Sequence, residues 1–266
     1  MVAHLSVDDK GVRGDQPGFD KAHVKTYGFG AIAAKDFIGE STWSSFVATT
    51  GWTLGDKATW PTVFNYDDPR FVKTMDWVRS LTDKGFAPKI GTFTTSDVDQ
   101  LSSGKVAMET GGSWEASTFA KIPGVKVGIA PTVLGPDGKR AVMSNSNGNN
   151  IWAGTKNPDL AWKWVSYMGS TACQTMASEK NGSFFPSIPA AMDAMSASLG
   201  KQGINLNVFT QYQKQNSLYS AAVYANGSAL QSAEQPLLDE FYDGSAGNSI
   251  FQTMQSKSVS VLSGQN

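Results

Sequence analysis

The sequence has few of the residues that metal sites and most catalytic centres require. Its 266 residues include one cysteine and two histidines. The lone Cys173 excludes an internal disulfide and a cysteine-cluster zinc site. His4 and His23 lie in loop-like surroundings, where we expect them to be exposed rather than to bind a metal. The chain also lacks a Gly-x-Ser-x-Gly motif. We therefore expect no metal, no cofactor and no catalytic residue.

Excess charge of one sign and long apolar runs are missing as well. The 22 basic and 23 acidic residues give a net charge of −1. Such a chain has no basic field for a phosphate backbone, so we expect no nucleic-acid partner. Its apolar runs are far shorter than the ~20 residues that span a bilayer. The first ten residues have neither the basic start nor the apolar core of a signal peptide.

Aromatic and neutral polar residues are what the sequence does contain. It has 8 Trp, 14 Phe and 7 Tyr, and charged residues make up only 17% of the chain. An indole stacks on the apolar C–H face of a sugar, and planar amides and carboxylates pair with its hydroxyl edge. The composition therefore favours a neutral, hydroxyl-rich ligand.

Strands alternate with helices along the chain, which predicts an α/β fold. The clearest helix is expected over 65–81, with Asp68 as its cap, Pro69 in its first turn and Gly85 after its end. Another should follow Asn157-Pro158 and bury a face that includes Leu160 and Trp164. The other predicted helices cover residues 37–50, 97–102, 114–119, 171–179, 236–242 and 249–262. Predicted strands cover residues 27–34, 106–110, 125–129 and 151–153.

Turns between these elements carry the candidate ligand groups. Trp43, Trp114 and the polar stretch 144–150 all lie at such turns, where α/β proteins place ligand-binding residues. The pair Gly111-Gly112 before Trp114 lets the backbone approach a ligand and expose its amides. Composition alone leaves open the alternative that both tryptophans are core residues and the Asn-rich stretch is only a turn.

Three glutamates near these turns leave an enzyme open as an alternative. Two of Glu40, Glu109 and Glu115 would suffice to cleave a glycosidic bond, provided that their separation suits it. Solvated carboxylates are the simpler interpretation.

One segment identifies a family. Gly104-Lys-Val-Ala-Met-Glu-Thr-Gly-Gly-Ser-Trp114 resembles the "G-K-x-A-M-x-x-x-G-x-W" segment of extracellular solute-binding proteins of sugar ABC importers, the maltose-binding-protein-like group. Ile151-Trp-Ala-Gly-Thr-Lys-Asn-Pro-Asp-Leu-Ala-Trp-Lys-Trp-Val165 resembles the strand and "S-K-N-P-x-x-A-W-x-F" helix of the same family. Upstream, residues 8–28 resemble its "D-G-K-G…P-G-F-D…Y-G-F" loop and strand. The likeness covers nearly the whole chain.

The resemblance implies an α/β, periplasmic-binding-protein-like fold of type II, with two lobes and a ligand between them. Residues 1–140 would belong to the second lobe, 141–190 to a hinge crossing and a remnant of the first lobe, and 191–266 to a helical return to the second lobe. By position, Trp114 resembles the stacking tryptophan of the second lobe. The other residues implied to contact sugar are Trp43, Glu40, Ser41, Ser113, Glu115, Asn147, Gly148 and Asn149.

In function, the resemblance implies a non-enzymatic carbohydrate receptor that delivers sugar to the membrane permease of an ABC importer. Its location would be extracellular, as a surface lipoprotein or in a periplasm. A glycoside-active enzyme and a cell-surface lectin remain the alternatives.

Compared with the family pattern, we expect the signal segment and most of the first lobe to be missing before Met1. We therefore expect Met1 to be an internal methionine and this chain to bind sugar weakly or not at all. We also expect an exposed apolar face around Trp152, Trp162 and Trp164, and a homodimer formed through it.

Overall fold

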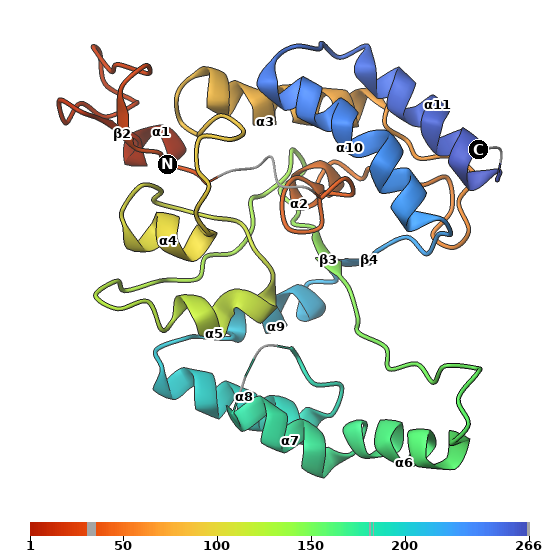
Figure 1. Ribbon diagram of the computed structural model, residues 1–266. Helices are drawn as coiled ribbons and strands as arrows, with labels where there is room; N and C mark the ends of the chain where they lie inside the picture. The colour runs from red at the N-terminus through yellow and green to blue at the C-terminus, as the bar shows by residue number, and fades with distance from the viewer. Residues whose placement is uncertain (31–35, 181, 183, 265–266) are drawn as a thin grey trace. The chain divides into compact units, whose positions relative to one another are not determined.

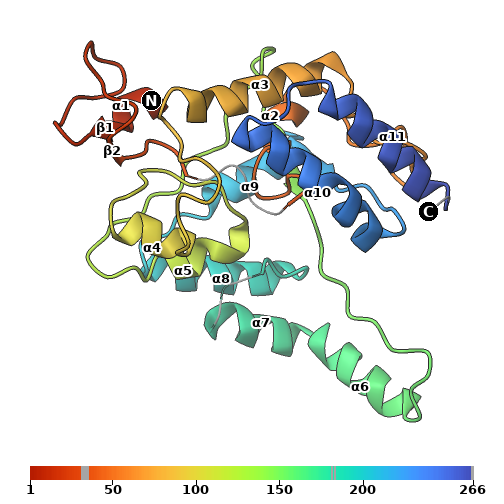
Figure 2. The same ribbon diagram turned by 45° about the horizontal axis from the view of Figure 1, so that its top comes forward.

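The computed structural model describes residues 1–30, 36–180, 182 and 184–264 (Figures 1 and 2). Helices dominate, and the strands are short. In chain order the elements are α1 (Val2–Leu5), β1 (Val7–Asp8), β2 (Val24–Thr26), α2 (Ser44–Ala48), α3 (Pro69–Asp83), α4 (Asp97–Ser102), the 3-10 turn η1 (Ser113–Glu115), α5 (Ala116–Phe119), β3 (Val142–Ser144), α6 (Pro158–Met168), α7 (Thr171–Lys180), α8 (Pro189–Lys201), α9 (Asn207–Lys214), β4 (Leu218–Ser220), α10 (Gly227–Asp243) and α11 (Ile250–Leu262).

The chain divides into two units. Unit 1 comprises residues 1–111, 132–144 and 216–266, and unit 2 comprises residues 112–131 and 145–215. The chain passes from unit 1 to unit 2 at residue 145, close to the predicted boundary at 140. The division also gives 112–131 and 191–215 to unit 2, which the predicted boundaries do not. The assignment of segments to lobes stays a prediction.

Unit 1 contains the strands. β1 pairs antiparallel with β2, and β3 pairs parallel with β4. Residues 27–30 run beside 105–108, joined by the bridge between Tyr27 and Val106. The predicted strand over 27–34 is described only to residue 30, since its remaining residues lie outside the described part of the chain. Of the predicted strand at 106–110 only Val106 pairs, in the bridge to Tyr27, so no strand forms there. The predicted strands at 125–129 and 151–153 are wrong as well. Their apolar pattern suits a strand, but these segments lack the neighbouring ladder that a strand requires.

Helix α3 confirms the sequence argument for a helix over 65–81. The side chain of Asp68 accepts a hydrogen bond from the Arg70 backbone N–H at 2.8 Å, and Pro69 occupies the first turn. Gly85 follows the helix at a φ of +75°, in the left-handed region that favours glycine. The buried face of the helix consists of Phe71, Met75, Val78 and Leu81.

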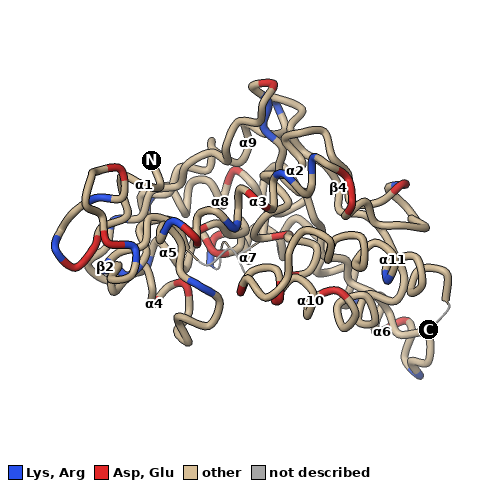
Figure 3. Tube along the Cα trace, turned by 90° about the horizontal axis from the view of Figure 1, so that it is seen from above, with Lys and Arg blue, Asp and Glu red and all other residues tan. Residues whose placement is uncertain are grey.

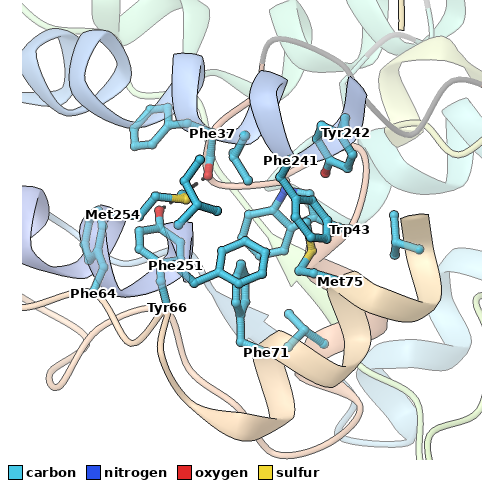
Figure 4. Close-up of a cluster of buried hydrophobic side chains, with 14 of the residues drawn as sticks. Phe37, Trp43, Phe64, Tyr66, Phe71, Met75, Phe241, Tyr242, Phe251 and Met254 are labelled. Atoms are coloured by element: carbon cyan, nitrogen blue, oxygen red, sulfur yellow. Dashed lines mark hydrogen bonds between the residues drawn. The ribbon is translucent and has the colours of Figure 1, made fainter. Parts of the chain in front are cut away.

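An aromatic core joins α3 to the two C-terminal helices of unit 1 (Figure 4). The ring of Phe71 lies edge-on to Trp43 and to Phe251, with centroids 5.1 Å apart in both pairs. The ring of Phe241 of α10 packs against that of Phe251 of α11, tilted by 53°, with centroids 4.7 Å apart. Such contacts add about 0.5–1.5 kcal/mol per pair to the free energy of burying the rings.

This core also contains a carboxyl group. Glu234 of α10 is 0% exposed, and its Oε2 accepts a hydrogen bond from the Tyr66 hydroxyl at 2.8 Å. Among the described residues, its Oε1 has no hydrogen-bond partner. Burial raises the pKa of Glu234 from its ordinary value of 4.5 to about 8. It is therefore held in the core largely as a neutral acid.

Unit 2 has a smaller core formed by α8 and the turns around it. Its buried apolar residues are Ala116, Met195, Leu199, Ile204 and Leu206. Helix α7 packs along α8.

The apolar side chains of α6 correct one expectation. Leu160 and Trp164, predicted to be buried, are 63% and 61% exposed. The structure instead has the exposed apolar surface expected around Trp152, Trp162 and Trp164. Because α6 contains no buried residue, its amphipathic pattern has no covering element in the described part of the chain.

Candidate ligand-binding site

The first group of candidate residues lies in η1 of unit 2. Gly112 precedes this turn with an extended backbone, and its N–H donates to Oε2 of Glu115 at 3.0 Å. The six-membered ring of Trp114 folds back over Gly112, so closely that a Cβ at Gly112 would overlap it. Only glycine therefore fits under this indole.

The local fold leaves Trp114 half-buried. The ring is held against Gly112 and still has accessible surface, as a stacking platform requires. One expectation changes: the Gly112 amide is already used by Glu115, so it is not free to donate to a ligand. Ser113 and Glu115 are also half-buried and lie in the same turn as Trp114.

The polar stretch before α6 is part of the same unit. Asn147, Gly148 and Asn149 are all exposed. The structure thus places these three residues and the Trp114 turn in unit 2. It places the other candidates, Glu40, Ser41 and Trp43, in unit 1.

In unit 1, Asp36 organises the segment that carries Glu40 and Ser41. Its Oδ2 accepts a hydrogen bond from the Ser41 N–H at 2.9 Å, and its backbone carbonyl accepts from Gly39 N–H at 2.9 Å. Burial raises the pKa of the Asp36 carboxyl. Glu40 and Ser41 are therefore presented, half-buried, by a hydrogen-bonded turn.

Asp36 was not among the predicted residues, although the sequence contains a signal for it. Asp36 and Gly39 occupy the first and fourth positions of a turn, where Asp and Gly are favoured.

Trp43 belongs to the core, which corrects the prediction that it contacts sugar. It is 0% exposed and packs edge-on against Trp52 and Phe71. A Cβ at Gly39 would overlap its indole. A ring without accessible surface cannot stack on a ligand. Of the two tryptophans that the composition allowed to be core residues, Trp43 is one and the half-buried Trp114 is not.

The histidines confirm their expected exposure. His4 and His23 are exposed, and each approaches one carboxylate, Asp15 at 2.9 Å and Asp20 at 3.0 Å. Residues that the structure describes form no cluster of three His, Cys, Asp or Glu side chains that suits a metal ion. Lys and Arg occur interspersed with Asp and Glu along the trace (Figure 3). None of the described helices is both long and apolar enough to cross a membrane.

A family model for bacterial extracellular solute-binding proteins matches residues 21–175, more than half of the chain. The chain belongs to this family. The sequence resemblance to solute-binding proteins is thereby confirmed. No curated protein matches the chain.

Solved structures of other solute-binding proteins share the fold. Mycobacterium tuberculosis UspC is 21% identical with a TM-score of 0.76, and the match covers 98% of this chain and 64% of UspC. The GacH receptor of Streptomyces glaucescens, solved unliganded and with acarbose, is 18% identical with a TM-score of 0.67 over 89% of this chain and 59% of GacH. M. tuberculosis UgpB, solved with glycerophosphocholine, is 16% identical with a TM-score of 0.67. The match covers 91% of this chain and 59% of UgpB.

These matches confirm the predicted periplasmic-binding-protein-like α/β fold for this solute-binding protein. The chain spans about three fifths of the length of the structures that it matches. Sequence identities this low show a shared fold and not a shared ligand. The ligand class must therefore be inferred from the side chains of this chain.

Proposed function

We propose that this chain is the carbohydrate-binding part of an ABC importer receptor, with Trp114 as its stacking residue. The observation that carries the proposal is the half-buried indole held against Gly112, with the Glu115 carboxylate in the same turn. The indole offers a flat apolar surface for the C–H face of a mono- or oligosaccharide, and the carboxylate is suited to accept hydrogen bonds from its hydroxyl groups.

Other predicted site residues have a supporting role in this proposal. In unit 2, the exposed amides of Asn147 and Asn149 supply donors and acceptors of the kind that sugar hydroxyls need. Glu40 and Ser41, half-buried in unit 1, offer the same chemistry in that unit and remain a separate prediction. Binding would need no covalent step, so we infer a receptor rather than an enzyme. Trp43 is left out of the proposed site because it lies in the core.

The transport role follows from the family. A solute-binding protein that delivers sugar to membrane permease subunits acts outside the cytoplasm, free in a periplasm or anchored as a surface lipoprotein. Ligand-dependent selection of one conformation would signal occupancy to the permease.

Calorimetric titration tests the ligand class. Maltose, other neutral sugars and glycerophosphocholine are titrated separately into the chain and into Trp114→Ala, with Trp162→Ala, an exposed tryptophan of the same unit, as the matched control. Because weak binding is expected of this chain, each ligand is added to millimolar concentration. We expect heat only with sugars, and affinity at least tenfold weaker in Trp114→Ala but unchanged in Trp162→Ala. Binding of glycerophosphocholine alone would contradict a carbohydrate receptor, since an indole also attracts a quaternary ammonium.

A homodimer through α6 is the second part of the proposal. Leu160, Trp164 and Tyr167 share one face at helical spacing and are all exposed. Apolar surface of this kind marks a protein contact. Light scattering should give twice the 28.4 kDa mass of the chain, and the monomer mass for Trp164→Lys. A monomeric wild-type chain would contradict this part of the proposal.

A further inference from the structure

The exposed indole of Trp60 lies on a tightly hydrogen-bonded hairpin of unit 1, between residues 52 and 65. Gly55 and Phe64 form a bridge across it. The carboxylate of Asp56 accepts from the backbone N–H and from the hydroxyl of Thr62, both at 2.8 Å. These bonds fix the end of the hairpin, residues 56–62, as a rigid loop.

The hairpin is also fixed to a neighbouring segment. The backbone N–H of Trp60 donates to the carbonyl of Val223 at 2.7 Å, and the backbone N–H of Val223 donates to the carbonyl of Ala58 at 2.9 Å. The position of Trp60 is therefore set from two sides, by its own hairpin and by the residues that follow β4.

The backbone of Trp60 is strained. Its φ is +53°, in the left-handed region, and Pro61 follows it. Bulky residues rarely adopt this conformation, and a residue before proline is driven towards extended backbone. Such strain is unfavourable and persists where the surroundings impose it, often at ligand sites.

The indole ring contributes little to the stability of the fold, because Trp60 is 61% exposed. Glycine would satisfy the backbone without strain and asparagine would tolerate it better. We therefore infer that a tryptophan stands at this position because a binding partner contacts its indole.

The surroundings of the ring match a sugar in size and chemistry. The backbone of Trp60 hydrogen-bonds that of Val223, whose side chain is also exposed, at 52%. Two exposed apolar side chains offer far less surface than the ~800 Å² per partner of a stable protein interface. The exposed polar residues Asp56, Thr59 and Thr62 flank it. Hydrogen bonds from Thr62 lower the pKa of Asp56, so its carboxylate stays ionised as an acceptor.

We propose that Trp60 stacks on one ring of a saccharide at a site of its own on the surface of unit 1, in addition to the site proposed at the Trp114 turn of unit 2. Val223 extends the apolar surface, and the hairpin carboxylate and hydroxyls face the hydroxyl edge of the sugar. This inference rests on the proposed carbohydrate function.

Nuclear magnetic resonance of the indole N–H signals tests it in the whole chain. The signals of Trp60 and Trp114 are assigned by their loss in Trp60→Phe and Trp114→Phe, and maltose or maltotetraose is added to millimolar concentration. We expect both signals to shift saturably. The Trp60 shift should survive in Trp114→Ala, and Trp152→Ala, which removes another exposed tryptophan, should leave it unchanged.

A glycine variant separates a binding role from a structural one. Trp60→Gly should keep or raise the melting temperature, because it relieves the strained φ, and it should weaken sugar binding at the hairpin about tenfold or more. A melting temperature lowered by several degrees would show that the ring serves the fold and would overturn the inference.

The remaining outcomes distinguish this inference from the function on which it rests. A sugar-dependent shift of Trp114 without one of Trp60 overturns only the hairpin site. No response of either signal to any sugar overturns both.

Discussion

Replacing Glu234 by Gln should remove most of the alkaline destabilisation of unit 1. The carboxyl is 0% exposed, accepts one hydrogen bond from Tyr66, and has a pKa raised by burial to about 8. In the unfolded chain it ionises near its ordinary value of 4.5. Between these two pH values the unfolded state releases a proton that the folded state retains, so the free energy of unfolding falls as pH rises.

The two pKa values set the magnitude. Each pH unit between 4.5 and 8 lowers the free energy of unfolding by about 1.4 kcal/mol, which gives roughly 5 kcal/mol over the whole window. Above pH 8 the contribution of Glu234 is constant, because both states are ionised. Water admitted to the site on ionisation reduces this figure, which is therefore an upper bound. Gln cannot ionise, and its amide oxygen can still accept the Tyr66 hydroxyl.

Urea unfolding followed by tryptophan fluorescence at pH 5, 7 and 9 measures the effect, because Trp43 and Trp52 lie in the core of unit 1. The stability advantage of Glu234→Gln over the wild type should grow from under about 1 kcal/mol at pH 5 to as much as about 5 kcal/mol at pH 9. Glu240→Gln changes an exposed carboxyl of the same helix and should follow the wild type. If Glu234→Gln has the same stability as the wild type at all three pH values, the claim that Glu234 is a neutral acid in the folded core is refuted.

Two further substitutions test packing and capping. Gly39→Ala should destabilise unit 1 by roughly 3 kcal/mol, because its φ is +67° and a Cβ would overlap Trp43; Gly91→Ala, at φ +78° in open space, should cost only about 1 kcal/mol in the same thermal melt. Equal losses in the two variants would contradict the contact with Trp43. Asp68→Ala should cost about 1 kcal/mol by removing the N-cap of α3, and Asp68→Asn should keep most of that stability; a negligible change in Asp68→Ala would show that the cap is not needed.

Local signals predicted the helices best. Helix α4 spans Asp97–Ser102 as predicted, and α3 begins at Pro69 after the cap at Asp68. These ends are set by residues next to them in sequence, so the pattern is sufficient. The turn that carries Trp114 was also predicted from local sequence, since the glycine before it is an adjacent residue; its role in binding stays a prediction.

Tertiary context decided the features that the sequence analysis missed. The strand pattern at 125–129 needs a neighbouring ladder that no local signal supplies. Trp43 and Trp114 both follow short polar turns, and what separates them is Phe71, Trp52 and Gly39 packed around Trp43. The strained backbone of Trp60 arises from Val223, far away in the chain, and could not be predicted from the hairpin sequence alone.

The central claim is that the indole of Trp114 lies against a saccharide ring. Intermolecular nuclear Overhauser effects in the sugar-bound chain test it most directly, because they identify the protons in contact. The account predicts effects between the ring protons of Trp114 and the C–H protons of one sugar face. A bound sugar whose protons show contacts elsewhere in the protein and none with Trp114 would contradict it.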